Sequence, residues 1–162
     1  MRSMPGFMRE LRRGEEAQVD ALLRRAFGGP DEARLVARLR KSGAMAGEMV
    51  VPTGEQVTAY AALSAMQAPK GWLCLAPVAV DPTAQGRRLG TRLLGMIAEW
   101  ARLSGVIVVV LGDVGIYRRA GFSAARAARL STPYQVAHTL LAGPGDDAPQ
   151  EQLIYPAAFG AP

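Results

Sequence analysis

The sequence has almost none of the residues that build disulfides and metal sites. Its 162 residues include one cysteine, Cys74, and one histidine, His138. A disulfide cannot form within such a chain, and a zinc site built from cysteine and histidine ligands is excluded. We therefore expect no metal ion in this protein.

Long apolar runs are missing as well. The longest aliphatic run, residues 106–111, is far too short to cross a bilayer. Residues 1–7 lack the sustained apolar core of a signal peptide. We expect a cytoplasmic protein without a membrane partner.

Lysine is scarce, yet the chain is basic. Only Lys41 and Lys70 are lysines, and the formal net charge is +5, so arginine carries nearly all of the positive charge. This balance suits an anionic ligand. The arginines are dispersed over predicted helices and loops, aromatic residues make up only 6%, and no nucleic-acid-binding motif occurs. We do not expect DNA or RNA to be the partner.

The apolar pattern predicts alternating strands and helices in a single domain, residues 1–162. With 49% hydrophobic residues, a chain of this length can bury one good core. Apolar spacing predicts helices over residues 15–27, 31–41 and 89–103, and a short helix that Asp113 caps. We expect residues 106–111 to form a central strand, buried on both faces. The other predicted strands are residues 7–12, 44–51, 56–66 (joined to 44–51 by a turn at 52–55), 72–80, one from Gly121, and 134–141.

The most informative segment is residues 78–94, where an apolar strand passes through a basic turn with two glycines into an amphipathic helix. Backbone N–H groups of such a turn, together with those of the first helical turn, point at one site. The positive end of the helix dipole adds to their attraction for an anion. The segment therefore predicts a cradle for a di- or polyphosphate, and so a nucleotide-like cofactor.

Two familiar phosphate motifs do not fit this turn. A P-loop needs a lysine followed by serine or threonine after its second glycine, and Gly90 is followed directly by Thr91. A dinucleotide fingerprint needs three glycines, whereas this turn has only Gly86 and Gly90.

The segment instead resembles the pyrophosphate loop of the GNAT superfamily of acyl-coenzyme A-dependent N-acetyltransferases. That loop has the pattern Gln/Arg-x-x-Gly-x-Gly/Ala, and here it reads Gln85-Gly86-Arg87-Arg88-Leu89-Gly90. Arg88 stands where the family usually has its first glycine, a residue that visits backbone angles closed to other side chains.

A second segment carries the same resemblance. Tyr117-Arg118-Arg119-Ala120-Gly121-Phe122 is similar to the Tyr-x-x-x-Gly-Phe with which the fourth helix of the superfamily passes into a strand. Val110 replaces the usual asparagine seven residues before the tyrosine, and Leu111-Gly112-Asp113 looks like a small bacterial subfamily.

The resemblance implies an α+β fold of GNAT type, with helices flanking a mixed central sheet in the order β-αα-βββ-α-β-α-ββ. It implies acetyl-coenzyme A as cosubstrate, with the pyrophosphate on the amides of residues 87–91 and the pantetheine arm on the strand backbone. The implied cofactor-binding residues are Val78, Ala79, Val80, Gln85, Gly86, Arg87, Arg88, Leu89, Gly90 and Thr91.

The implied reaction is direct attack of a primary amine on the thioester in a ternary complex, with Tyr117 as the acid that protonates the departing sulfur. No glutamate or aspartate precedes Asp81 in the strand, so water would relay the proton of the amine. His138 is a weaker candidate for this step, because a lone strand histidine usually has a packing role. Cys74 would carry the acetyl group in a ping-pong route, although a small buried hydrophobe explains it better.

Several alternatives stay open at this stage. The same fold would serve a non-catalytic sensor that holds acyl-coenzyme A without turnover. A small amine, a peptide N-terminus and a lysine all remain as acceptors. The apolar tail around Tyr155-Pro156 and Phe159 leaves a homodimer open, since it would either extend a sheet or cover a neighbouring subunit.

Overall fold

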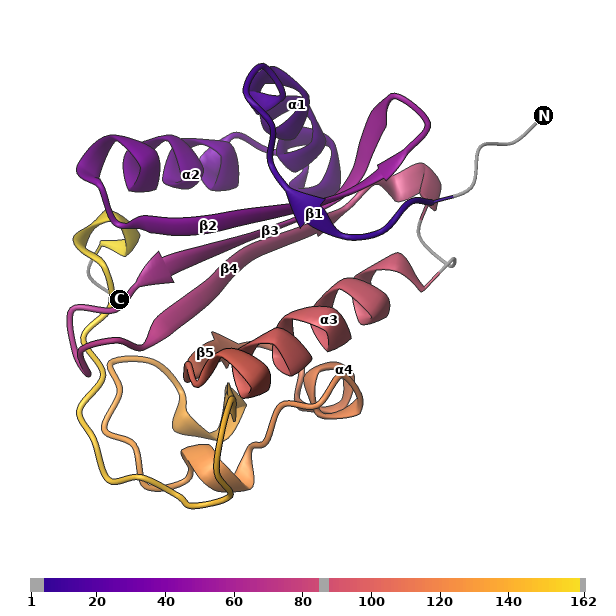
Figure 1. Ribbon diagram of the computed structural model, residues 1–162. Coiled ribbons are helices and arrows are strands. Elements are labelled where there is room, and N and C mark those ends of the chain that lie inside the picture. The colour runs from indigo at the N-terminus through magenta and orange to yellow at the C-terminus, as the bar shows by residue number, and fades with distance from the viewer. Residues whose placement is uncertain (1–4, 85–87, 161–162) are drawn as a thin grey trace.

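Six strands form one mixed sheet with helices on both faces (Figure 1). The computed structural model describes residues 5–84 and 88–160. The strands lie in sequence order, and every neighbouring pair is antiparallel except the parallel pair β4–β5. The elements are β1 (Arg9–Glu10), α1 (Glu16–Phe27), α2 (Asp31–Ser42), β2 (Met45–Thr53), β3 (Gln56–Ala65), β4 (Leu73–Val80), α3 (Leu89–Ser104), β5 (Val108–Leu111), α4 (Val114–Arg119) and β6 (Thr139–Ala142), with single 3-10 turns at Pro82–Ala84, Ala125–Ala127, Val136–His138 and Ala157–Phe159.

Strand β3 is buried along almost its whole length because helices cover both faces of the sheet. Side chains alternate between the faces of a strand. Ala59, Ala61 and Leu63 therefore pack toward α3, whereas Tyr60 and Ala62 pack toward α1 and α2. In Figure 1, α1 and α2 lie on one side of the sheet, and α3 and α4 lie on the other.

Most predicted elements are confirmed, including both long N-terminal helices, the hairpin of β2 and β3, and the helix after the basic turn. The predicted strand at residues 7–12 is reduced to Arg9–Glu10. The strand predicted at residues 106–111 is confirmed from Val108 onward as β5, whose Val108, Val109 and Val110 are buried and whose Leu111 is exposed. It lies fifth of six strands, between β4 and β6.

Of two strand predictions near the C-terminus, the strand from Gly121 is wrong and the strand at residues 134–141 is confirmed only in its last residues. After Gly121 there is only an isolated bridge between Ser123 and Leu141, followed by a 3-10 turn. Residues 134–138 do not join the sheet, because the His138 amide donates to the Gln135 carbonyl at 3.1 Å and so closes a second 3-10 turn over Val136–His138. The strand β6 therefore begins only at Thr139, whose hydroxyl donates to the same carbonyl at 2.9 Å.

The C-terminal tail packs against its own chain. The Ile154 amide donates to the Ala68 carbonyl at 2.9 Å, and the Gln67 amide donates to the Ile154 carbonyl at 2.8 Å. The Tyr155 ring meets Tyr134 edge-on, with centroids 4.9 Å apart, and the centroid of the Phe159 ring lies 5.9 Å from that of Tyr155. These contacts cover the face of β4, β5 and β6 that α1 and α2 leave open.

Candidate functional site

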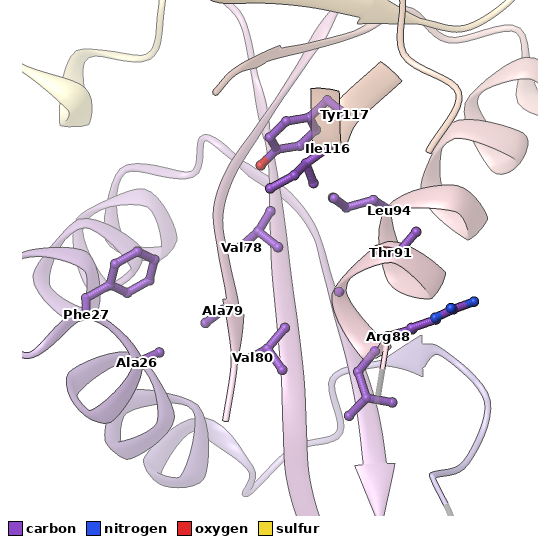
Figure 2. Close-up of a pocket in the computed structure, with 12 residues that line it drawn as sticks. Ala26, Phe27, Val78, Ala79, Val80, Arg88, Thr91, Leu94, Ile116 and Tyr117 are labelled. Atoms are coloured by element: carbon purple, nitrogen blue, oxygen red, sulfur yellow. The ribbon is translucent and has the colours of Figure 1, made fainter. Parts of the chain in front are cut away.

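A cavity of about 510 Å³ opens beside the C-terminal half of β4. It is bounded by the end of α1, the start of α3 and the short helix α4, as Figure 2 shows. All predicted site residues that the structure describes lie in its wall, although the predictions came from separate parts of the sequence. The lining residues are Ala26, Phe27, Val78, Ala79, Val80, Arg88, Leu89, Gly90, Thr91, Leu94, Ile116 and Tyr117.

The cavity exists because β4 and β5 pair over a short distance only. Their ladder pairs Leu73 with Val108 and Cys74 with Val109 and goes no further. Beyond it, β4 has one extra residue relative to β3, since Leu75 pairs with Leu63 but Val78 pairs with Ala61. Such a bulge bends a strand and increases its twist. The C-terminal half of β4 therefore leaves β5 and becomes a wall of the cavity.

The start of α3 forms the basic end of the cavity. The first amides of a helix have no acceptor within the helix, and the side chain of Arg88 does not cap them. A Cβ atom on Gly90 would lie 3.2 Å from Cγ2 of Val80, so a glycine here lets the helix approach β4 closely. Gln85, Gly86 and Arg87, also predicted to bind the cofactor, lie outside the described residues.

Arg88 has a left-handed backbone, with φ 57° and ψ 25°. It is the one non-glycine residue with positive φ in the described part of the chain. This is the position at which the GNAT pattern has glycine, and a side chain in this conformation costs about 1–2 kcal/mol. The arginine therefore keeps the glycine-like backbone and accepts the strain.

Asp81 ties the end of β4 to α1. It accepts hydrogen bonds from the Thr83 amide at 3.0 Å, from the Thr83 hydroxyl at 2.8 Å and from Arg25 of α1 at 2.8 Å. Burial by itself would raise the pKa of this carboxyl, but the bonds from Thr83 and Arg25 outweigh it and hold the pKa below its usual value. The ion pair between Arg25 and Asp81 holds the end of α1, with Ala26 and Phe27, beside the end of β4.

Tyr117 lies at the other end of the cavity, on α4, where Asp113 caps the helix as predicted by accepting from the Ile116 amide at 2.9 Å. The ring of Tyr117 meets Phe122 edge-on, with centroids 5.6 Å apart. It also lies flush against Gly112, because a Cβ atom there would be 2.5 Å from Cε2 of the ring. These contacts on two sides hold the ring in one orientation.

The hydroxyl of Tyr117 has no hydrogen-bond partner among the described residues. Burial raises the pKa of this phenol, and the nearby Cys74 adds to the increase. Tyr117 is therefore protonated throughout the physiological pH range, as a proton donor must be.

The two other reactive side chains lie away from the cavity. Cys74 is 3% exposed, and burial raises the pKa of its thiol to about 12, so it has almost no thiolate at neutral pH. This argues against the ping-pong route. His138 is exposed on the 3-10 turn before β6, so the expectation that it lies in a strand is wrong.

Four lining residues were not singled out from the sequence: Ala26, Phe27, Leu94 and Ile116. Helical spacing in residues 15–27 favours a core-facing position for both Ala26 and Phe27. Phe27 is instead 45% exposed, at the cavity rim. No signal in the sequence brings the end of α1 next to the start of α3, because their approach depends on the sheet between them.

Residues 5–84 and 88–160 contain neither a metal-binding cluster nor a membrane-spanning helix. No group of three or more histidine, cysteine, aspartate or glutamate side chains there is arranged to hold a metal ion. Within the same residues, no helix combines the length and the apolar character that crossing a bilayer requires.

Comparison with known proteins gives one consistent result. The sequence profile of the Acetyltransferase (GNAT) family matches residues 16–122. The chain is 36% identical to the uncharacterized N-acetyltransferase YhbS of Escherichia coli K12 over 115 residues, which cover 66% of this chain and 67% of that protein.

Two solved structures share the fold over nearly the whole chain. The crystal structure of Escherichia coli YhbS in complex with CoA has 30% identity and a TM-score of 0.85, over 98% of this chain and 92% of that one. A GNAT family acetyltransferase from Brucella melitensis in complex with acetyl-CoA has 30% identity and a TM-score of 0.80, over 97% of this chain and 99% of that one.

Proposed function

Because the chain belongs to the GNAT family of acetyltransferases, we propose that it binds acetyl-CoA in the cavity beside β4 and transfers the acetyl group directly to a primary amine. One observation carries this proposal: a single cavity collects the start of α3, residues 78–80 of β4 and Tyr117. The CoA and acetyl-CoA bound to the two similar crystal structures support the choice of cofactor.

In this proposal the two ends of the cavity bind different parts of the cofactor. The pyrophosphate lies at the start of α3, on the amides of residues 87–91, with Gln85 and Gly86 completing the loop. Arg88 adds a positive charge at the same end. The pantetheine arm lies along residues 78–80 of β4 and carries the thioester toward Tyr117. The cavity walls there are apolar, from Val78, Leu94 and Ile116.

Transfer then follows from proximity and one proton donor. The neutral amine attacks the thioester carbonyl, a C–N bond forms, and the C–S bond of the tetrahedral intermediate breaks. The amine loses its proton to water, and the departing thiolate takes a proton from the Tyr117 hydroxyl. Burial weakens this phenol as an acid, but a thiolate against the same apolar walls is destabilised too, so its proton affinity rises in parallel.

Titration calorimetry and a CoA-release assay test the proposal together. We expect micromolar binding of acetyl-CoA and CoA, weak binding of ATP, and steady release of CoA with some members of a broad amine panel. Tyr117→Phe should lower kcat by about 100-fold, within the range of general acid catalysis, and leave acetyl-CoA affinity nearly unchanged.

Tyr155→Phe is the matched control. This substitution also removes one tyrosine hydroxyl, but Tyr155 does not line the cavity. Absence of CoA binding would refute the proposed site. Binding without release over the whole panel would favour an acyl-CoA sensor instead, and full activity of Tyr117→Phe would remove Tyr117 from the mechanism.

A further inference from the structure

Exposed arginines without acidic partners gather on α3 and α4, which lie side by side in Figure 1. Arg88 directly precedes α3 and lines the cavity beside β4, and Arg92 lies in the first turn of the helix. Arg118 and Arg119 are the last two residues of α4. All four side chains are exposed, and none of them has an ion pair or a hydrogen bond within the described residues.

One close contact brings the two pairs of arginines together. A Cβ atom on Gly95 would lie 3.9 Å from the carbonyl oxygen of Ala120, which directly follows Arg119. Gly95 itself is three residues after Arg92, about 5 Å further along the helix. The end of α4 therefore adds its charges to those at the start of α3, and we call the four arginines the α3–α4 strip.

No carboxylate neutralises this strip in the described part of the chain. Neither residues 82–98 nor residues 114–130 contain an aspartate or a glutamate. The next acidic residue of α3, Glu99, pairs with Arg102, and Asp113 lies at the opposite end of α4, where it caps the helix. Such an uncompensated positive surface attracts anionic partners and accelerates their association.

The strip offers more charge than the proposed cofactor uses. With its pyrophosphate on the amides at the start of α3, CoA keeps one further phosphate, the 3′-phosphate, and a single guanidinium group matches a phosphate in a bidentate pair. The reactive arm of CoA, phosphopantetheine, also occurs on a serine of small acidic carrier proteins. A protein attached to that arm would lie outside the cavity, next to Arg88, where the strip begins.

We propose that the α3–α4 strip binds an acidic carrier protein, whose serine-linked acyl-phosphopantetheine enters the cavity beside β4 as a second acyl donor. The phosphate of the arm lies on the amides at the start of α3, and the arm follows β4 as that of CoA does. The amine attacks the thioester carbonyl, the C–N bond forms, the C–S bond breaks, and the carrier thiolate takes the proton of Tyr117. This inference rests on the proposed acetyl transfer, because it assigns another donor to the same cavity.

Titration calorimetry with an acidic acyl carrier protein tests the proposal without turnover. The holo form carries the arm with a free thiol, and the apo form lacks the arm. We expect micromolar binding of the holo form, at least tenfold weaker binding of the apo form, and loss of holo binding in the presence of saturating CoA. Absence of holo binding would overturn the proposal. Equal binding of the two forms would also overturn it, because the strip would then attract any polyanion.

Charge reversal tests the strip itself. Arg92→Glu and Arg119→Glu should each weaken binding of the holo carrier protein at least tenfold, because repulsion replaces attraction at the interface. The matched control is Arg34→Glu, which makes the same charge change at an exposed arginine of α2, on the other side of the sheet, and should weaken binding less than threefold. Equal affinity of the three variants would overturn this inference alone, whereas absence of acetyl-CoA binding by the wild-type protein would refute the proposed function itself.

Discussion

Replacing Arg88 with glycine should stabilise the fold and weaken cofactor binding at the same time. Glycine relieves the strain of the left-handed backbone at φ 57°, which is worth about 1–2 kcal/mol. It also removes a positive charge from the N-terminus of α3, where the helix dipole makes such a charge unfavourable by about 0.3–1 kcal/mol. The greater freedom of glycine in the unfolded chain takes back about 0.5–1 kcal/mol. The net gain of about 1 kcal/mol should raise Tm by about 2–4 °C in a protein of this size.

Arg88→Ala separates the two effects, because it loses the same charge but keeps a Cβ atom at positive φ. We expect the glycine variant to be more stable than the alanine variant by about 1 kcal/mol in thermal or denaturant unfolding. Both should bind acetyl-CoA about threefold to tenfold more weakly in calorimetry, as for one exposed charge. An alanine variant as stable as the glycine variant would refute the argument from strain, and unchanged affinity in both would show that this cradle acts through its backbone.

Two further predictions concern residues around the proposed site. Gly112→Ala should displace the Tyr117 ring by about 1 Å and lower kcat about 10- to 100-fold, with little change in acetyl-CoA affinity. The control Gly95→Ala should keep full activity, because its Cβ would meet nothing closer than 3.9 Å. Equal activity of the two variants would contradict the positioning role of Gly112. Cys74→Ala should cost about 1–2 kcal/mol of unfolding free energy and retain turnover, because the thiol is buried and protonated; a folded but inactive Cys74→Ala would instead restore the ping-pong route.

Local pattern was sufficient for the secondary elements that carry the site. Helical spacing and flanking glycines place α1, α2 and α3 within a residue or two of their observed ends, and the turn at residues 52–55 places the hairpin. The basic turn before α3 and the Tyr117 segment were recognisable because each is a short continuous motif. For the same reason, Arg88 could be identified from the sequence as a residue at a glycine position.

The failures lie where a local hydrogen bond competes with an extended pattern. Residues 134–141 alternate like a strand, but the Gln135 carbonyl accepts from both the His138 amide and the Thr139 hydroxyl. That arrangement turns the chain and leaves His138 exposed on the 3-10 turn before β6. A periodicity argument does not register such a turn, since the turn depends on side-chain and backbone geometry rather than on hydropathy.

The sequence by itself determined the order of helices and strands as far as α4, the basic turn before α3 and the tyrosine motif, because each depends on residues within one short segment. Only the tertiary structure decided that β4 separates from β5, that Phe27 lines the cavity beside β4, and that the ring of Tyr117 packs directly against Gly112. These features depend on strand register and on close packing between segments far apart in the chain, and spacing along a sequence does not encode such distances.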